Sequence, residues 1–178
     1  MNMTSVHDRC TAIATFRYVS VWLMETIARW TPTTPEMEAK VMFGRHIWDY
    51  AQMADALGKR TFELRQPMHH TVPPAAAYMG LLNEVAALSS TADRLSAIHS
   101  CMLPCLIKRL KHYVALSDAI LDEPSIVIIE HMAGTIARQH SEAEALKIEL
   151  KLGDGEGVSG FTVREQAIFS LVAERATA

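Results

Sequence analysis

The sequence is poor in cysteine, in net charge and in long hydrophobic runs. Its 178 residues include three cysteines, a small odd number that argues against a disulfide framework and suits a reducing cytoplasm. The formal net charge of −3 gives no electrostatic reason to expect a nucleic-acid partner. The longest apolar runs, residues 19–24 and 125–129, are far too short to span a membrane, so no membrane association is expected.

An export signal and β-strands are also missing from the pattern. The N-terminus carries Asp8 and Arg9 and has no apolar core followed by a cleavage site, so we predict a cytoplasmic protein. No stretch alternates apolar and polar residues over a useful length, and no internal repeat is present. Nearly half of the residues are hydrophobic (49%), which is enough for the core of a single domain over residues 1–178.

Hydrophobic residues instead recur at helical spacing along most of the chain. Prolines and polar clusters divide this pattern into short helices at 75–88 and 161–175 and long ones at 5–30, 36–65, 92–120 and 124–152. Four long helices predict an all-α four-helix bundle, with its core within residues 5–152 and a short C-terminal helix outside it. The long crossover between the second and third long helices, residues 66–91, is the wiring of ferritin-like bundles.

Local signals predict how two of these helices begin and where one is broken. Thr91 is the predicted N-cap of the third long helix, and Asp122, followed by Pro124 in the first turn, is the predicted cap of the fourth. Pro104 lies inside the third long helix, where it removes a backbone hydrogen bond. We therefore expect a kink near residues 100–104.

The helix at 36–65 contains one residue that its hydrophobic stripe does not explain. Alternating steps of four and three place six positions on one face, namely Ala39, Phe43, His46, Tyr50, Met53 and Leu57. Five of them suit a bundle core, and the sixth is His46, with Asp49 beside the stripe. His46 is either a hydrogen-bonded core residue or a functional group, and the spacing alone does not decide between the two.

Several segments resemble the ferritin-like superfamily, in particular an uncharacterised bacterial branch of the rubrerythrin or di-iron carboxylate type. They are Gly44-Arg45-His46-Ile47-Trp48-Asp49, then residues 54–60 and 63–65, and Asp122-Glu123-Pro124. The resemblance implies a ferritin-like four-helix bundle. Metal-binding members place Glu on two helices and Glu-x-x-His on the other two. This sequence has no Glu-x-x-His, and Gln52 and Met53 stand at the ligand positions of the second helix, so the implied site is degraded.

A smaller site can still be assembled from residues at one level of such a bundle. Antiparallel pairing places Glu25 near His46, with His140 at a comparable height and His112 as a further ligand. We predict that Glu25, His46, His140 and His112 bind iron or manganese, and that Glu25, His46, Asp49 and His140 are catalytic. In this site Asp49 orients a histidine. An acid/base set without any cofactor is an equal alternative.

The expected activity follows from this site. Tyr18, Trp22, Tyr50 and Met53 are predicted to wall a cavity for a small organic molecule, which makes the chain a ferritin-like enzyme, either a metal-dependent oxygenase or oxidoreductase or a metal-free acid/base catalyst. The alternative is a non-catalytic ferritin-like binding or scaffold protein that has lost its metal site. The expected partners are a small-molecule substrate and a second copy of the chain, forming a homodimer.

Overall fold

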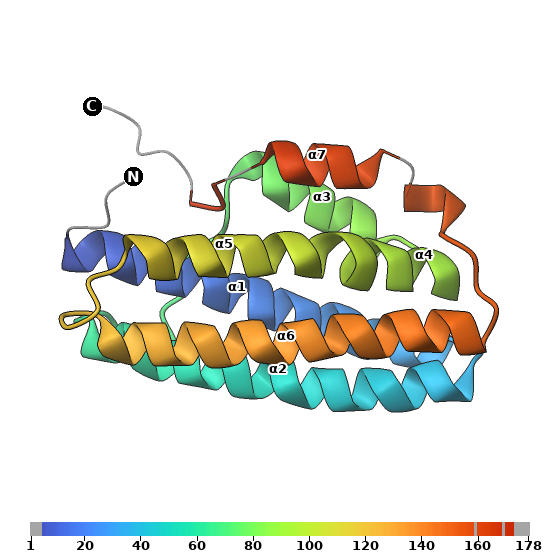
Figure 1. Cartoon of the computed structure of the whole chain (residues 1–178), viewed down its shortest axis with the longest axis horizontal. Coiled ribbons are helices and arrows are strands. Elements are labelled where there is room, and N and C mark those ends of the chain that lie inside the picture. Colours follow the sequence, from blue (N-terminus) through green and yellow to red (C-terminus); the bar gives the residue numbers. More distant parts are fainter. Residues whose placement is uncertain (1–4, 159, 169, 173–178) are drawn as a thin grey trace.

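The fold is helical throughout the residues that the structure describes. The computed structural model describes residues 5–158, 160–168 and 170–172, apart from the side chain of residue 156. Over these residues there is no β-strand, so the predicted all-α class is confirmed. Figure 1 shows long helices lying side by side, with shorter ones along one side of the bundle. None of the described helices is long and apolar enough to cross a membrane.

The first two long helices form an antiparallel pair close to the predicted positions. They are α1, Val6–Trp30, and α2, Met37–Glu63. Ser5 caps α1 because its side chain accepts a hydrogen bond of 3.1 Å from the Asp8 amide. Between the two helices the 3₁₀ helix η1, Thr31–Thr33, carries a proline in its first turn and turns the chain back on itself.

The third long helix is interrupted by a π-helix just before Pro104, near the position of the predicted kink. After α3, Ala76–Ala86, the chain continues through α4, Thr91–Leu95, the π-helix η2, Ser96–Met102, and α5, Leu103–Leu116. Pro104 has no amide hydrogen to donate to the carbonyl four residues earlier, and the wider π turns just before it accommodate that loss. The helix ends at Leu116 rather than near residue 120 as predicted.

Of the two predicted N-caps, Thr91 is wrong and Asp122 is confirmed in its position. Ser90 rather than Thr91 caps α4, because the Ser90 hydroxyl accepts a hydrogen bond of 3.1 Å from the Asp93 amide. The Thr91 hydroxyl donates instead to the Glu36 carboxylate at 2.5 Å. Asp122 does precede the fourth long helix, α6, Glu123–Glu149, but its side chain makes no capping hydrogen bond.

The Asp122 carboxylate holds one end of the bundle together. It is fully buried and accepts hydrogen bonds from Arg60 at 3.2 Å, Ser125 at 2.6 Å and the Tyr113 hydroxyl at 2.7 Å. Burial, reinforced by the hydrogen bond to Asp122, raises the pKa of Tyr113 well above its ordinary value, so this hydroxyl keeps its proton. Because the donors come from α2, α5 and α6, the carboxylate joins three of the four long helices.

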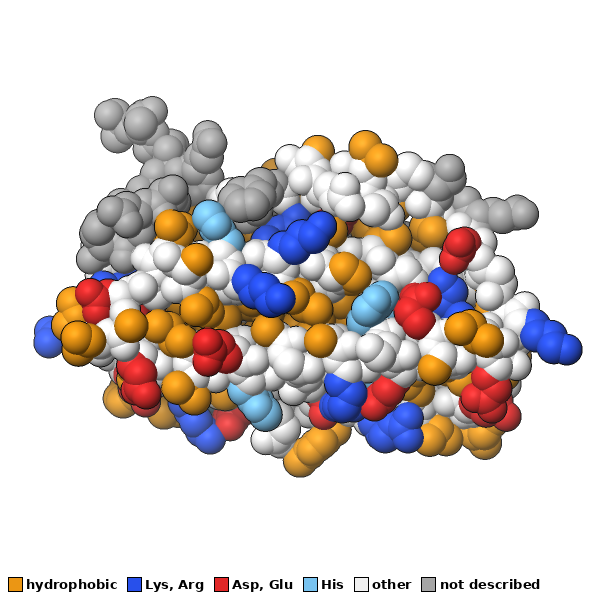
Figure 2. All heavy atoms as spheres, in the orientation of Figure 1, with side chains coloured by type: hydrophobic (Ala, Val, Ile, Leu, Met, Phe, Trp, Pro, Cys, Tyr) orange, Lys and Arg blue, Asp and Glu red, His pale blue; other side chains and the backbone are white. Residues whose placement is uncertain are grey.

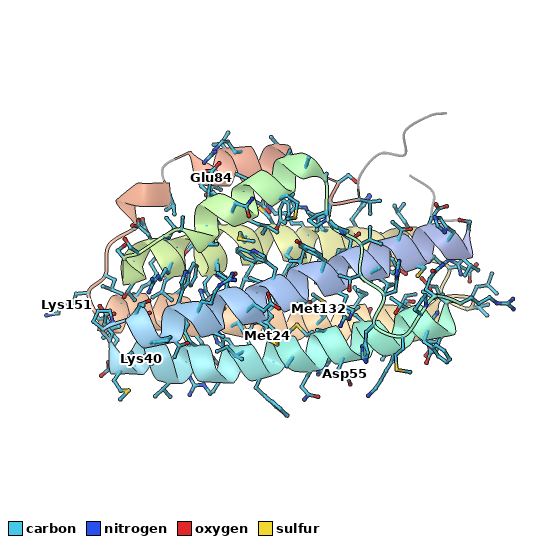
Figure 3. All side chains as sticks on the ribbon, turned by 180° about the vertical axis from the view of Figure 1, so that it is seen from behind. Met24, Lys40, Asp55, Glu84, Met132 and Lys151 are labelled. Atoms are coloured by element: carbon cyan, nitrogen blue, oxygen red, sulfur yellow. The ribbon has the colours of Figure 1, made fainter. Side chains whose placement is uncertain are left out.

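The four long helices surround one core. α1 pairs with α2 and α5 pairs with α6, while α2 also contacts α6. Phe16 of α1 meets Tyr113 of α5 edge to face, with ring centroids 5.9 Å apart, which closes the ring of helices. Met132 of α6 lies in the core, and Met24 of α1 packs against it at the edge (Figure 3).

The C-terminal helix is shorter than predicted. It is α7, Phe161–Ala167, preceded by the 3₁₀ helix η3, Glu156–Val158. Residues 168 and 170–172 are not helical, so the predicted extent of 161–175 is wrong at its end, and residues 173–175 lie outside the described part of the chain. α7 packs beside α3 and over the third long helix (Figure 1).

α7 is anchored by a buried charge. The Glu165 carboxylate is fully buried and forms an ion pair with Arg109 of α5, which also donates to the Glu165 carbonyl at 3.0 Å. One turn away, Thr162 makes a 2.7 Å contact with the Cys101 sulfur. Burial raises the pKa of the Cys101 thiol and raises that of Cys105 to about 12, so both thiols are unreactive while α7 is in place.

Replacing Glu165 with alanine is expected to release α7 from the bundle. Loss of a buried charge-assisted contact should accelerate amide exchange over residues 161–167 by about 10- to 100-fold. Hydrogen-exchange mass spectrometry measures this effect, and alkylation of Cys101 and Cys105 should accelerate with it. Cys10, which is buried in α1, serves as the internal control. The exposed Gln166→Ala is the matched control variant, and equal exchange in both variants would contradict the anchoring role.

Candidate functional site

His46 lies at the centre of a chain of hydrogen bonds that crosses the bundle. His46 lies on the core-facing side of α2 together with Phe43 and Tyr50, and its side chain is fully buried. Nε2 of His46 is 3.0 Å from Oε2 of Glu142 on α6, and its Nδ1 is 3.1 Å from Nε2 of His99 on η2. Both ring nitrogens of His46 are therefore occupied by protein partners.

Sequence reasoning alone misses His99 and Glu142. The His99 ring is fully buried and stacks on Phe43, with centroids 6.4 Å apart and planes 11° apart. Its signal was present in the sequence, because it stands four residues after Leu95 and three before Met102, both of which are core positions. Glu142 has no comparable signal, since a partly exposed carboxylate on a helix is ordinary.

The hydrogen-bond partners of His46 determine which ring nitrogens of His46 and His99 carry protons. Ionised Glu142 can only accept, so Nε2 of His46 carries a proton and Nδ1 of the neutral ring accepts. His99 then donates from Nε2 to His46, which leaves Nδ1 of His99 without a hydrogen-bond partner in the core. If His46 becomes doubly protonated, His99 must accept instead. Its own proton then moves to Nδ1, on the side of the Leu95 carbonyl.

Burial sets the charge states of His46 and His99 in this hydrogen-bonded series at neutral pH. It lowers the pKa of His46, and the hydrogen bond and charge of Glu142 offset only part of that effect. Burial also lowers the pKa of His99, well below its usual range, and His46 and His140 act in the same direction. For Glu142, burial opposes ionisation, but hydrogen bonds from His46 and Arg138 together outweigh it and lower its pKa. Two neutral imidazoles therefore adjoin an ionised carboxylate.

Asp49 does not orient a histidine, so that prediction is wrong. Its Oδ2 accepts hydrogen bonds from Arg138 at 2.7 Å and Gln139 at 3.0 Å, both on α6. Arg138 also donates to Glu142 at 2.7 Å, so the two carboxylates share one guanidinium. Glu142 orients His46 instead, because α6 places it opposite that ring while Asp49 lies further around α2, away from the core.

His140 reaches the cluster through the backbone. Its Nδ1 donates to the carbonyl of His99 at 2.8 Å, and its side chain is half-buried. The structure thus brings His46, Asp49 and His140 to one level of the bundle, as predicted. His140 contacts the main chain of η2, whereas a site shared with His46 would need its imidazole turned toward that ring.

The predicted inward positions of Glu25 and His112 are wrong. Both residues are exposed, Glu25 on α1 and His112 on α5. Glu25 follows the buried Leu23 by two positions, which turns it roughly 200° around the helix and away from the core. His112 directly precedes the buried Tyr113 and lies on the outer side of α5. The four predicted metal ligands therefore do not converge.

The side chains near His46 do not fit iron or manganese. Within the described part of the chain, no group of three or more His, Cys, Asp and Glu side chains could hold a metal ion. His46 has both nitrogens engaged, and the Glu142 carboxylate is shared between His46 and Arg138. A site of histidine and carboxylate ligands needs side chains that are free to turn toward one ion, and neither His46 nor Glu142 is free to do so.

The four residues predicted to wall a substrate cavity are part of the core packing. Tyr50 and Met53 belong to the continuous hydrophobic core, and Tyr18 and Trp22 pack against its edge. None of the four lines either of the grooves described next. Tyr50 and Met53 are buried, whereas Tyr18 and Trp22 are partly exposed, so the four residues do not share one environment.

Two adjoining grooves lie on the outer side of α2 and α6. One, of about 460 Å³, is lined mainly by Met37, Val41, Met42, Arg45, Glu142 and Leu146. The other, of about 530 Å³, is lined by Val41, Gly44, Arg45, Trp48, Asp49 and Arg138. Glu142 therefore connects the core to the first groove, since it contacts His46 in the core and lines that groove. The grooves are the accessible part of the site.

Comparison with protein-family models, with curated proteins and with solved structures found no match for this chain. The fold and the site therefore define the protein by themselves. It is an all-helical bundle in which a buried histidine pair is linked, through a carboxylate, to a groove between two helices. The relationship to the ferritin-like superfamily stays a prediction from the sequence motifs.

Proposed function

We propose that this protein is a non-catalytic helical scaffold that works as a homodimer, built on a ferritin-like bundle without a metal site. The observation that carries the proposal is the complete burial of the His46 and His99 imidazoles within a hydrogen-bonded chain. A catalytic group must reach its substrate at hydrogen-bond distance, directly or through one water. These two rings are sealed from solvent, so they serve the core, and the accessible grooves serve binding.

The network around His46 supports a structural role. Its hydrogen bonds link α2 to η2 and to α6, so they fix the relative positions of three segments that are distant in the sequence. Buried polar networks of this kind favour one packing arrangement, because a shifted arrangement leaves polar groups without partners. A scaffold needs that rigidity to present a constant outer surface.

The scaffold proposal predicts that iron and manganese do not bind. Untagged protein incubated with Fe(II) or Mn(II) under anaerobic conditions and then desalted should retain less than about 0.1 equivalent of metal. Elemental analysis measures the retained metal, and thermal unfolding provides a second readout, because a bound metal would stabilise the folded state. The unfolding temperature should be the same with and without a chelator.

His46→Gln and Glu142→Gln are the matched variants for this experiment. Under the scaffold proposal, both retain as little metal as the wild-type protein. Retention of about one equivalent by the wild type, lost in both variants, would overturn the proposal and favour a metal-dependent oxidoreductase. Metal that binds equally to all three proteins would indicate surface sites such as the exposed histidines.

A second candidate function is acid/base catalysis on a small molecule in the α2–α6 groove. The observation that favours it is Glu142, an ionised carboxylate that lines the groove and is held from behind by His46. Groups with perturbed pKa values in a groove are a recurrent feature of active sites. This function would require the charge of Glu142, whereas a scaffold has no reaction that depends on that charge.

A further inference from the structure

The first half of α2 is hydrophobic on both of its sides. Its inner side carries buried residues including Ala39, Met42 and Phe43. Its outer side carries Met37, Val41 and Trp48, which are 66%, 55% and 66% exposed. An amphipathic surface helix has one apolar side, and a helix that is apolar all round is normally covered on both. Within the described part of the chain, these three outer side chains are left exposed to solvent, beside charged neighbours such as Glu38 and Arg45.

The exposed residues form a regular stripe. Met37, Val41, Gly44 and Trp48 follow one another at steps of four, three and four, which places them on one face of the helix. In Figure 3 side chains of α2 between the labelled Lys40 and Asp55 project away from the bundle. We call these four residues the α2 stripe. It is continuous with both grooves, because each groove includes members of the stripe in its lining.

The α2 stripe carries both a protruding group and a recess of matching kind. Trp48 is the exposed aromatic side chain of the stripe and forms one wall of the groove of about 530 Å³, and Val41 and Gly44 line the rest of this recess on α2. A different partner protein would need only one of the two. A two-fold symmetric contact uses both, because each protomer supplies the same patch and receives the same patch. This combination points to a second copy of the chain.

Gly44 is the point of closest approach in such a contact. A side chain added at Gly44 would meet nothing within 4 Å, so the bundle itself does not require glycine there. Glycine in a helix costs stability, and a small residue lets the backbones of two crossing helices approach closely. When two antiparallel helices cross at Gly44, Trp48 of one chain comes level with Val41 of the other.

The charges beside the α2 stripe suit an identical partner. Arg45 lies 3.9 Å from Glu142, and Arg138 lies 2.7 Å from both Asp49 and Glu142. Glu38 and Glu149 also line the first groove, so the rim carries charged groups of both signs with an excess of carboxylates. Figure 2 shows both signs mixed with hydrophobic side chains along the edge where Figure 1 places α2 and α6. In a two-fold symmetric contact, an arginine of one copy can face a carboxylate of the other, so a rim with both signs suits an identical partner.

We propose that two copies of the chain associate through the α2 stripe, with the two α2 helices crossing antiparallel at Gly44 and Trp48 of each protomer seated against Val41 in the groove of its partner. This inference rests on the proposed homodimeric scaffold and specifies its interface. Burial of an indole at the centre of a patch is the arrangement that dominates the affinity of protein interfaces. The paired charges then form the rim.

The test is the self-association of the full-length chain, measured by sedimentation over a range of protein concentrations. The wild type is expected to be a dimer. Gly44→Leu should weaken dimerisation by at least about 100-fold, because a branched side chain at the crossing separates the two helices. Trp48→Glu should weaken it to a similar extent. Both positions are open in the single chain, so circular dichroism at low concentration should match the wild type, and thermal unfolding should occur at the wild-type temperature or, for Gly44→Leu, somewhat above it.

Gly134→Leu is the matched control. Gly134 lies on the outer side of α6, and a side chain added there also meets nothing within 4 Å. This variant should keep the dimer affinity of the wild type. A second, positive measurement uses Gly44→Cys and Gly134→Cys under mild oxidation. A disulfide between protomers should form at position 44 and not at 134, since it requires α-carbons within about 7 Å.

The outcomes separate the interface from the proposed function. A wild-type dimer whose affinity is unchanged in Gly44→Leu and in Trp48→Glu would overturn this interface and leave a homodimeric scaffold with another contact surface. A wild type that stays monomeric up to about 1 mM protein would overturn the homodimer as well, and would assign the α2 stripe to a different protein, since affinities weaker than that do not sustain a specific dimer.

Discussion

Replacing Asp122 with alanine is expected to lower the free energy of unfolding by about 3 to 5 kcal/mol, the cost of removing one partner from a buried ion pair. Three donors lose their acceptor at once, namely Arg60, Ser125 and Tyr113. Arg60 is the most expensive of them, because its guanidinium is almost fully buried and keeps only the exposed Glu63 as a carboxylate partner. The variant should therefore unfold at a much lower urea concentration.

Urea unfolding followed by circular dichroism measures this effect. The control is Glu123→Ala, which removes the neighbouring carboxylate at an exposed position and should leave stability near that of the wild type. Asp122→Asn keeps the volume and one acceptor oxygen, so it should fall between the two. A loss of less than about 1 kcal/mol in Asp122→Ala would contradict the buried network as the joint between α2, α5 and α6.

The second large expected effect is a loss of stability in mild acid that originates at His46 and His99. The pKa of each is lower in the folded protein than the ordinary value near 6.5, and burial is the main cause. The unfolded chain therefore binds more protons than the folded chain below about pH 6.5, and the free energy of unfolding falls as pH falls through that value. The loss should be larger for His99, whose pKa burial lowers further, than for His46, and each unit between the folded and unfolded pKa values corresponds to about 1.4 kcal/mol.

The pH window of this effect is separate from that of the carboxylates. The pKa of Glu142 is lowered, so its contribution is present above its ordinary value near 4.5 and is lost only below it. Urea unfolding at several pH values between about 7 and 5 therefore isolates the histidines. His46→Gln should reduce the slope of the free energy of unfolding against pH, and His131→Gln, at an exposed position, should leave that slope unchanged. An unaltered slope in His46→Gln would show that groups other than His46 cause the loss of stability in mild acid.

Much of the fold could be predicted from the sequence because helical periodicity is a local property. The stripe of α2 identified Phe43, His46 and Tyr50 as inward-facing, and all three are buried. Pro104 identified the broken segment of the third long helix, since a missing amide hydrogen acts on the residues next to it. These predictions depend on neighbours within one or two turns, which the sequence displays directly.

The sequence could not show the role of a capping side chain where distant residues compete for it. Asp122 has the right identity and position for a cap, yet Arg60 and Tyr113 from other helices bind its carboxylate instead. The Glu25 prediction failed for a different reason, because it rested on the height of Glu25 along the bundle and height does not fix the side of the helix. Glu25 follows the buried Leu23 by two positions, so it points away from the core. Which side of a helix faces its neighbours depends on how side chains of different helices interlock.

The sequence by itself determined the helical class, the course of the long helices and the burial of His46, because each follows from spacing along a single helix. Only the tertiary structure decided which groups His46 meets. His99 and Glu142 reach it from segments 53 and 96 residues away, and Glu25 and His112 do not. The physical reason is that the relative height and rotation of packed helices are set by the fit of many side chains together, which no single segment specifies.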